Sequence, residues 1–153
     1  MTWTIDGLPL HPLLVHGAVM LIAVNALALV GALVVKRFRV WAGWGLPLVG
    51  AASAVTALLT KEAGENMLNG FPAEGTPLAE HTQWGGLAGV WGMVLGATTV
   101  IAWLSWSPLV LAKAPWLAHP AVRVVVVLAG MGVAIAATTL DILAGRAGCV
   151  ACS

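Results

Sequence analysis

Four long apolar runs dominate the pattern of hydrophobic and polar positions along the chain, at about residues 13–35, 41–60, 84–106 and 121–144. A helix needs about 20 apolar residues to cross the roughly 30 Å hydrocarbon core of a bilayer, and each run meets that length. The pattern therefore predicts an all-α integral membrane protein, a four-helix bundle organised as a single transmembrane domain over residues 1–153.

Charged residues of the two signs are separated along this pattern. Five of the seven basic residues accompany the first and third connections, and all six acidic residues lie elsewhere. The basic residues are Lys36, Arg37, Arg39, Lys113 and Arg123, and the acidic residues are Asp6, Glu62, Glu65, Glu74, Glu80 and Asp141. Because cytoplasmic connections carry the excess of Lys and Arg, we expect both termini on the outer side. The leader has no basic residue, so we expect the first run to be a retained helix and not a signal peptide.

Composition narrows the class of protein further. Only 8% of the residues are charged, whereas soluble domains average about a quarter. The connections are too short to bury a core of their own. The net charge is +1 and the basic residues lie beside apolar runs, which gives no sign of nucleic-acid binding. We therefore expect the lipid bilayer to cover most of the surface.

Small residues predict where the helices pack, because lipid offers no hydrophobic drive for helix association. They form sets in the third and fourth runs and a shorter pair in the second: Gly85, Gly89, Gly92 and Gly96; Gly130, Gly132, Ala134 and Ala136; Gly50 and Ala54. Polar residues within the runs are candidates for hydrogen bonds between helices: Asn25, Ser53, Thr56, Thr98, Thr99, Thr138 and Thr139. We expect both sets to hold the bundle together, and a homo-oligomer would use the same kind of contact.

Two histidines on one side of the predicted bundle suggest a cofactor. His16 and His81 begin the first and third helices, which run in the same direction. Since imidazole is a common axial ligand of haem iron, we predict that the pair ligates a b-type haem. The face of His16 continues through Met20 and Leu27, and that of His81 through a Gly-rich strip with room for a macrocycle or for a neighbouring helix. A histidine near the interface is otherwise a polar contact between helices or a titrating group.

The remaining polar groups at the outer end have two interpretations. His11 lies five residues before His16, about 140° around a helix, so the two imidazoles do not share a face. His11 is a candidate for cofactor contact, or for a zinc or copper site with His81 and a carboxylate.

The carboxylates at that end are candidates for a proton or polar relay. Glu62 and Glu65 are three residues apart and share a helical face, and Asp141 ends the fourth run. Alternatively, Glu62 and Glu65 are solvated at a helix end or pair with Lys61.

Cys149 and Cys152 form a CxxC at the end of the sequence. On an oxidising outer side this pair could form a disulfide, and it is also a candidate metal site. Ser153 follows where a c-type haem site has histidine. We expect the pair to follow a helix C-terminus, where the helix dipole disfavours a thiolate, so a fast thiol catalyst is disfavoured.

Three segments resemble an uncharacterised family of small bacterial four-span membrane proteins, a domain of unknown function. They are Leu10-His11-Pro12-Leu13-Leu14-Val15-His16, Thr60-Lys61-Glu62-Ala63-Gly64-Glu65 and Glu80-His81. The resemblance covers about residues 8–145 and implies a multi-pass protein of the bacterial plasma membrane. Some relatives carry a Rieske iron–sulfur domain, which implies electron transfer. The chain departs from the family pattern at Gly17 and Ala18, and it has no histidine in residues 138–145, where many members carry one.

These observations predict three functions in order of preference. The first is a b-type haem protein that passes electrons between the membrane and a redox partner at the outer face. The second is a non-catalytic subunit or scaffold of a larger membrane complex. The third is an outer-face thiol or metal protein that uses Cys149 and Cys152. The residues name no substrate, and they leave open whether the protein is an enzyme.

Overall fold

The computed structural model describes residues 4–5, 8–68 and 77–151, and side chains over residues 14–65 and 83–146. The elements follow the apolar runs and the breaks between them. In chain order they are β1 (Thr4–Ile5), β2 (Leu8–Pro9), α1 (Leu10–Val34), α2 (Lys36–Ala42), α3 (Gly45–Leu68), α4 (Pro77–Leu104), α5 (Pro108–Leu111), the 3-10 helix η1 (Pro115–Ala118) and α6 (Pro120–Ala151). The predicted all-α bundle is confirmed, with a short antiparallel β1–β2 pair added before α1.

Three helices are long and apolar enough to cross a membrane on their own. They provide candidate spans at Leu14–Val34, Gln83–Leu104 and Pro120–Arg146. The second predicted span passes the same test only when α2 and α3 are taken together, and these two helices are bent by 75° relative to each other. Length and composition therefore support three spans, and a fourth if the bent pair counts as one.

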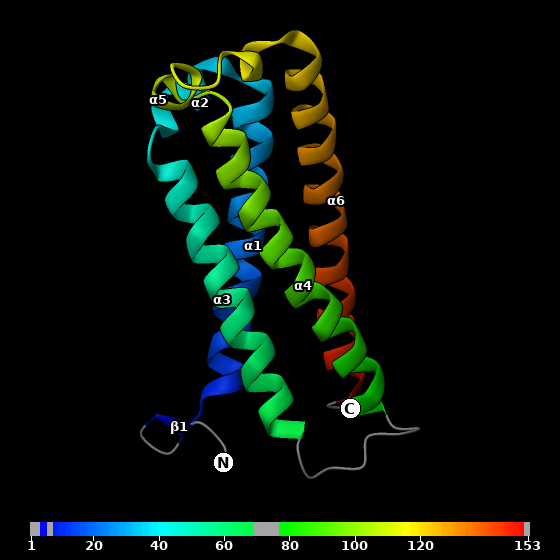
Figure 1. Ribbon diagram of the computed structural model, residues 1–153. Coiled ribbons are helices and arrows are strands. Elements are labelled where there is room, and N and C mark those ends of the chain that lie inside the picture. Colours follow the sequence, from blue (N-terminus) through cyan, green and yellow to red (C-terminus); the bar gives the residue numbers. More distant parts are fainter. Residues whose placement is uncertain (1–3, 6–7, 69–76, 152–153) are drawn as a thin grey trace.

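The bend between α2 and α3 occurs at Gly43. Its φ of 47° lies in the left-handed region, which glycine enters without the strain that a Cβ would cause. The Gly43 N–H donates to Arg39 O over 3.3 Å, so the end of α2 is hydrogen-bonded as the chain turns. Because of this turn, α2 lies across the end of the bundle and does not continue the line of α3 (Figure 1).

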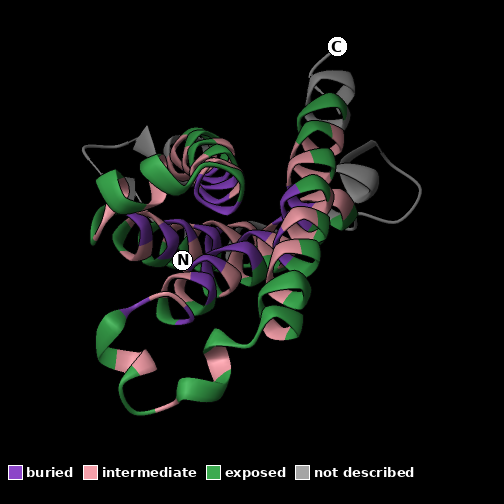
Figure 2. Cartoon of the chain, turned by 90° about the horizontal axis from the view of Figure 1, so that it is seen from above, coloured by how far each residue is buried: buried purple, intermediate pink, exposed green. Residues whose placement is uncertain are grey.

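The four long helices lie side by side and alternate in direction (Figure 1). Helix α3 packs against α1 and α4, and α6 packs against α4 and α1. One end of the bundle, called here the His16 end, holds the beginnings of α1 and α4 and the ends of α3 and α6. The other end, called the Arg39 end, holds α2, α5 and η1. Figure 2 shows that buried residues line the sides of the helices that face one another.

The long helices extend beyond the predicted runs, most of all α3, α4 and α6. Helix α4 begins at Pro77, before the predicted start at about residue 84. Helix α3 continues past Thr60 to Leu68, and α6 continues past Ala144 to Ala151. The added residues of α3 include the charged Lys61, Glu62 and Glu65, whose backbone groups stay in the helical ladder. Asp141 therefore lies inside α6, not at its end as the sequence suggested.

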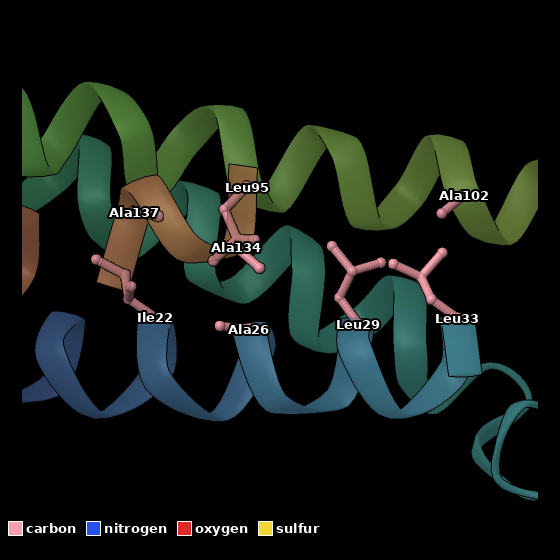
Figure 3. Close-up of a cluster of buried hydrophobic side chains, with 8 residues drawn as sticks. All are labelled: Ile22, Ala26, Leu29, Leu33, Leu95, Ala102, Ala134 and Ala137. Atoms are coloured by element: carbon pink, nitrogen blue, oxygen red, sulfur yellow. The ribbon is translucent and has the colours of Figure 1, made fainter. Parts of the chain in front are cut away.

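The apolar core is built mainly from α1, with small residues opposite it. Its members are Ile22, Ala26, Leu29 and Leu33 of α1, Leu95 and Ala102 of α4, and Ala134 and Ala137 of α6 (Figure 3). Leucine side chains of α1 and α4 fill the space that alanines of α4 and α6 leave. Large and small residues therefore alternate across the contact, which allows the helices to pack closely.

Helices α3 and α4 make the closest helix–helix contact. A Cβ at Gly50 would lie 3.0 Å from Gly96 O and 3.0 Å from Thr99 Cβ, and one at Gly96 would lie 2.7 Å from Ala54 Cβ. The strip on α4 that the sequence offered to either a macrocycle or a helix is thus filled by a helix at Gly92 and Gly96. Among the α6 glycines, Gly130 meets Leu33, whereas a Cβ at Gly132 would meet nothing within 4 Å.

Candidate functional site

The predicted gathering of polar side chains at one end of the bundle agrees with the helix arrangement. Helices α1 and α4 begin where α3 and α6 end, so His16 and the charged residues of α3 share the His16 end (Figure 1). Thr60 links two of these helices, because its Oγ1 lies 2.8 Å from Thr56 O on its own helix and 3.2 Å from Leu14 O on α1. This hydroxyl ties the end of α3 to the beginning of α1.

Lys61 and Glu65 form an ion pair one turn apart on α3. The methylene stem of Lys61 packs on α4, where a Cβ at Gly89 would lie 3.3 Å from Lys61 Cβ. The side chain thus covers a glycine with its apolar part and presents its ammonium to Glu65. The alternative that one of the two carboxylates pairs with Lys61 is therefore confirmed for Glu65, and the relay role of Glu62 and Glu65 stays a prediction.

Asp141 is half-buried on α6 within the candidate span Pro120–Arg146. It follows Ala137 by one turn, and Ala137 belongs to the core beside Ile22 (Figure 3). An ionisable residue inside a membrane span is a functional candidate by default, because its charge is expensive there. The role of Asp141 in a polar relay stays a prediction.

His16 lies on the outside of the bundle. Its side chain is exposed, and so are those of Met20 (66%) and Leu27 (74%) on the same side of α1. The core side of α1 carries Ile22 and Leu29 instead. The alternative interpretation of His16, as a polar contact or a titrating group, stays a prediction.

The other predicted ligands fall at or beyond the edge of the described side chains. The backbone of His11 lies in α1 and that of His81 in α4, so both belong to the His16 end. Cys149 lies within α6, which corrects the expectation that the cysteine pair follows a helix C-terminus, and Cys152 lies outside the described residues. Within the described part of the chain, no three His, Cys, Asp or Glu side chains gather into a metal-binding group.

A second polar site lies in the middle of the bundle. Asn25 of α1, Ser53 of α3 and Thr99 of α4 are fully buried. Ser53 lies between Gly50, which meets Thr99, and Ala57, which meets Gly92 at the level of Ile22. Asn25 follows Ile22 by one turn and lies 3.0 Å from Thr99 through its Oδ1. The three polar side chains therefore occupy about the same depth.

The single hydroxyl hydrogen of Thr99 limits how these groups can interact. Thr99 Oγ1 lies within hydrogen-bond distance of both Asn25 Oδ1 (3.0 Å) and Leu95 O (2.9 Å), but a hydroxyl has one hydrogen to donate. The conflict disappears when the Asn25 amide is turned over, so that Nδ2 donates to Thr99 Oγ1 and Thr99 donates to Leu95 O. In the described orientation, Asn25 Nδ2 and Ser53 Oγ are the buried side-chain atoms without a described partner. After the turn, the amide oxygen takes the place of Nδ2, and a water molecule would satisfy such buried polar atoms.

The sequence identified these polar residues only as a set of candidates for contacts between helices. That prediction is confirmed for the Asn25–Thr99 pair. It is wrong for Thr98, Thr138 and Thr139 in the described contacts, because each hydroxyl donates to a carbonyl one turn back on its own helix. Helical period alone does not separate the two cases, since a threonine can always bond its own helix.

Arg39 is a structural residue that the sequence analysis treated only as a topology signal. Its Nε donates to Ala32 O over 2.7 Å and its Nη2 to Leu33 O over 3.2 Å, which satisfies carbonyls at the end of α1. Its guanidinium also lies 4.0 Å from the ring centroid of Trp106. A basic residue shortly after a predicted helix end is the sequence signal for such a cap.

Comparison with protein-family models, with curated proteins and with solved structures finds no match to this chain. The family resemblance therefore rests on the three short segments alone. The helix lengths, their apolar composition and their packing decide the class. This chain is a small multi-span membrane protein whose long helices pack as a bundle in contact with lipid.

Proposed function

We propose that the protein is a membrane redox protein that binds a b-type haem at the His16 end, with His16 and His81 as axial ligands. The observation that supports this most is the exposed position of His16, outside the core and on an apolar strip of α1. An ionisable residue within or near a membrane span is a functional candidate by default, and an imidazole exposed on the side of α1 away from the core is placed where a cofactor could reach it.

The donor set fits a haem in part. His16 offers an imidazole that lies outside the core, and the exposed Met20, one turn further along α1, offers apolar surface for a porphyrin edge. On α4, a Cβ at Gly85 or at Gly86 would meet nothing within 4 Å, whereas Gly92 is closed by Ile22 and Ala57. Open surface is therefore available near the beginning of α4 and not in the middle of the bundle.

When bound, a haem with two imidazole ligands supplies one-electron transfer. The chain's contribution would be to hold the ligands and to exclude water with apolar side chains. Because His16 lies on the side of α1 away from the core, the haem would lie outside the four-helix contact. His81 would then come from the same chain around the end of the bundle, or from a second copy.

The optical spectrum of protein purified in detergent from haem-replete cells tests this proposal. We expect a Soret band, split α and β bands on reduction, and loss of these bands in His16→Ala. His119→Ala is the matched control, because His119 is an exposed histidine at the Arg39 end. A colourless preparation, or a His16→Ala variant with the wild-type spectrum, would refute the proposal, and the haem-to-chain ratio distinguishes one copy from two.

A second candidate is a subunit of a larger membrane complex, favoured by the uncovered side of α6. Leu128 and Ile135 are 68% and 64% exposed, and a Cβ at Gly132 between them would meet nothing within 4 Å. A small residue flanked by large ones allows another helix to approach closely. Crosslinking through a cysteine placed at Gly132 should capture a specific partner, and a strictly solitary chain in native membranes would exclude this function.

The thiol or metal function of Cys149 and Cys152 stays a prediction. Alkylation before and after reduction in intact membranes would test it directly. Thiols that are always free and hold no metal would exclude it.

A further inference from the structure

We propose that the Arg39 end of the bundle binds the head group of an anionic phospholipid, with its phosphate held between Arg39 and Arg123. This proposal is independent of the haem. It rests on the charges, the hydrogen-bond donors and the exposed apolar side chains of the Arg39 end, which holds α2, α5, η1 and the beginning of α6 (Figure 1).

The charges at this end are all of one sign among the described side chains. Five basic residues lie there, and the described carboxylates lie toward the other end: Lys36, Arg37, Arg39, Lys113 and Arg123 against Glu62, Glu65 and Asp141. Burial, and after it the nearby charge of Arg123, lower the pKa of the Arg39 guanidinium. Arg39 and Arg123 both lie at this end, where the described side chains include no carboxylate, so a bound anion would stabilise the site.

Arg39 has hydrogen-bond donors left for such an anion. An arginine carries five N–H groups, and the described contacts of Arg39 use one on Nε and one on Nη2, both toward carbonyls of α1. The stacking on Trp106 holds the guanidinium plane in place. The remaining N–H groups are therefore pre-oriented, and arginine binds phosphate oxygens through paired donors of this kind.

The surroundings indicate a lipid phosphate and not a soluble one. Val40 (74%), Trp41 (79%) and Trp44 (64%) are exposed along α2 and the turn after it. Trp116, at 65%, is exposed on η1 at the same end. Tryptophans with basic residues beside them are typical of helices at the level of lipid head groups. The apolar side chains would contact acyl chains while the arginines bind the phosphate.

Thermal unfolding in a neutral detergent tests the proposal, with tryptophan fluorescence as the signal. The unfolding midpoint is measured while dioleoylphosphatidylglycerol or dioleoylphosphatidylcholine is titrated into the sample. We expect the unfolding midpoint to rise with the anionic lipid and to change little with the zwitterionic one. Arg123→Gln should raise the half-saturating concentration of the anionic lipid about fivefold, the contribution of one basic residue near a membrane surface. Arg123 is suited to this test because it is exposed, whereas Arg39 also caps α1.

Arg146→Gln is the matched control, since Arg146 is an exposed arginine on the same helix toward the His16 end and the variant has the same change in charge. It should titrate like the wild type. Equal effects of the two variants, or equal effects of the two lipids, would refute the site. If inorganic phosphate alone reproduces the stabilisation, the site takes free phosphate and the lipid assignment is wrong. Native mass spectrometry of the wild type, which should retain phosphatidylglycerol in preference, checks the result without relying on a variant's fold.

Discussion

Two regions of the bundle differ in the size of their side chains. The contact between α3 and α4 is lined by small residues, whereas the outer side of α6 carries large apolar ones. At the α3–α4 contact, glycine and alanine bring the backbones so close that a Cβ at Gly96 would overlap Ala54. On α6, large side chains such as Leu128 and Ile135 point away from the bundle. The candidate span in α6 is more apolar than the one in α4, yet a smaller share of it is buried. The reason is that lipid solvates leucine as well as a protein core does. In this protein small and polar residues, and not hydrophobicity, mark the contact surfaces.

Among the substitutions that test this comparison, Gly96→Ala should lower the free energy of unfolding most. The added methyl group would meet the backbone of α3, which cannot move aside as a flexible side chain can. We expect a loss of about 1 to 3 kcal/mol in the free energy of unfolding, the usual cost of overpacking. Equilibrium unfolding in mixed micelles measures it, with Gly132→Ala as the control, because a Cβ there meets nothing within 4 Å. Equal losses in both variants would show that α3 and α4 are not the closest pair.

Thr99→Val should have the next largest effect, because it leaves the fully buried Asn25 without its partner. We expect a loss of about 1 kcal/mol, within the roughly 0.6 to 1.7 kcal/mol found for hydrogen bonds between membrane helices. The neighbouring Thr98→Val removes only a bond to Val94 O on its own helix and should be close to neutral. In a double-mutant cycle, the variant that carries both Thr99→Val and Asn25→Leu should lose less free energy of unfolding than the sum of the losses in the two single variants. Strict additivity would mean that Asn25 and Thr99 do not interact.

Ser53→Ala should have a smaller effect and decides whether the buried polar centre holds water. Ser53 Oγ has no described partner, so its removal should change the free energy of unfolding by less than about 0.5 kcal/mol, in the stabilising direction. A loss near 1 kcal/mol would instead mean that the hydroxyl hydrogen-bonds a bound water. The same micelle unfolding experiment measures both outcomes.

Ile135→Ala should have the smallest effect, because its side chain faces lipid. We expect a change within about 0.5 kcal/mol for the isolated chain. The informative comparison is between the purified chain and the native membrane. If the variant is neutral after purification but lowers the amount of protein in cells, then α6 is covered there by another helix, as the second candidate function requires.

The predictions from sequence were most accurate where one physical effect dominates. Apolar length located the four long helices, and charge separation placed five of the seven basic residues at one end of the bundle. The helix ends were less accurate, because Lys61, Glu62 and Glu65 stop a hydropathy window but do not stop a helix. The Gly50–Ala54 pair illustrates a second limit. A spacing that occurs in several helices does not reveal which two of them meet, and the partner turned out to be Gly96.

In the candidate site, too, the sequence indicated where a residue lies along its helix but not which neighbours it contacts. The sequence grouped His16 with the charged residues at the end of the second run. The side of α1 that carries His16 depends on which helices pack against α1, and these are neighbours in space and not in sequence. The role of Arg39 was hidden for a similar reason. The guanidinium reaches carbonyls six and seven residues back only because the chain turns between α1 and α2.

The amino-acid sequence by itself determined that this protein resides in a membrane, how many long helices it forms, and that its charges divide between two ends. These properties follow from transfer free energies, which add residue by residue along the chain. Only the tertiary structure decided that Asn25 bonds Thr99, that Gly50 meets Gly96, that Arg39 stacks on Trp106 and that His16 faces outward. Each of these is a relation between helices, and it depends on how four helices rotate and slide against one another, which no local period specifies.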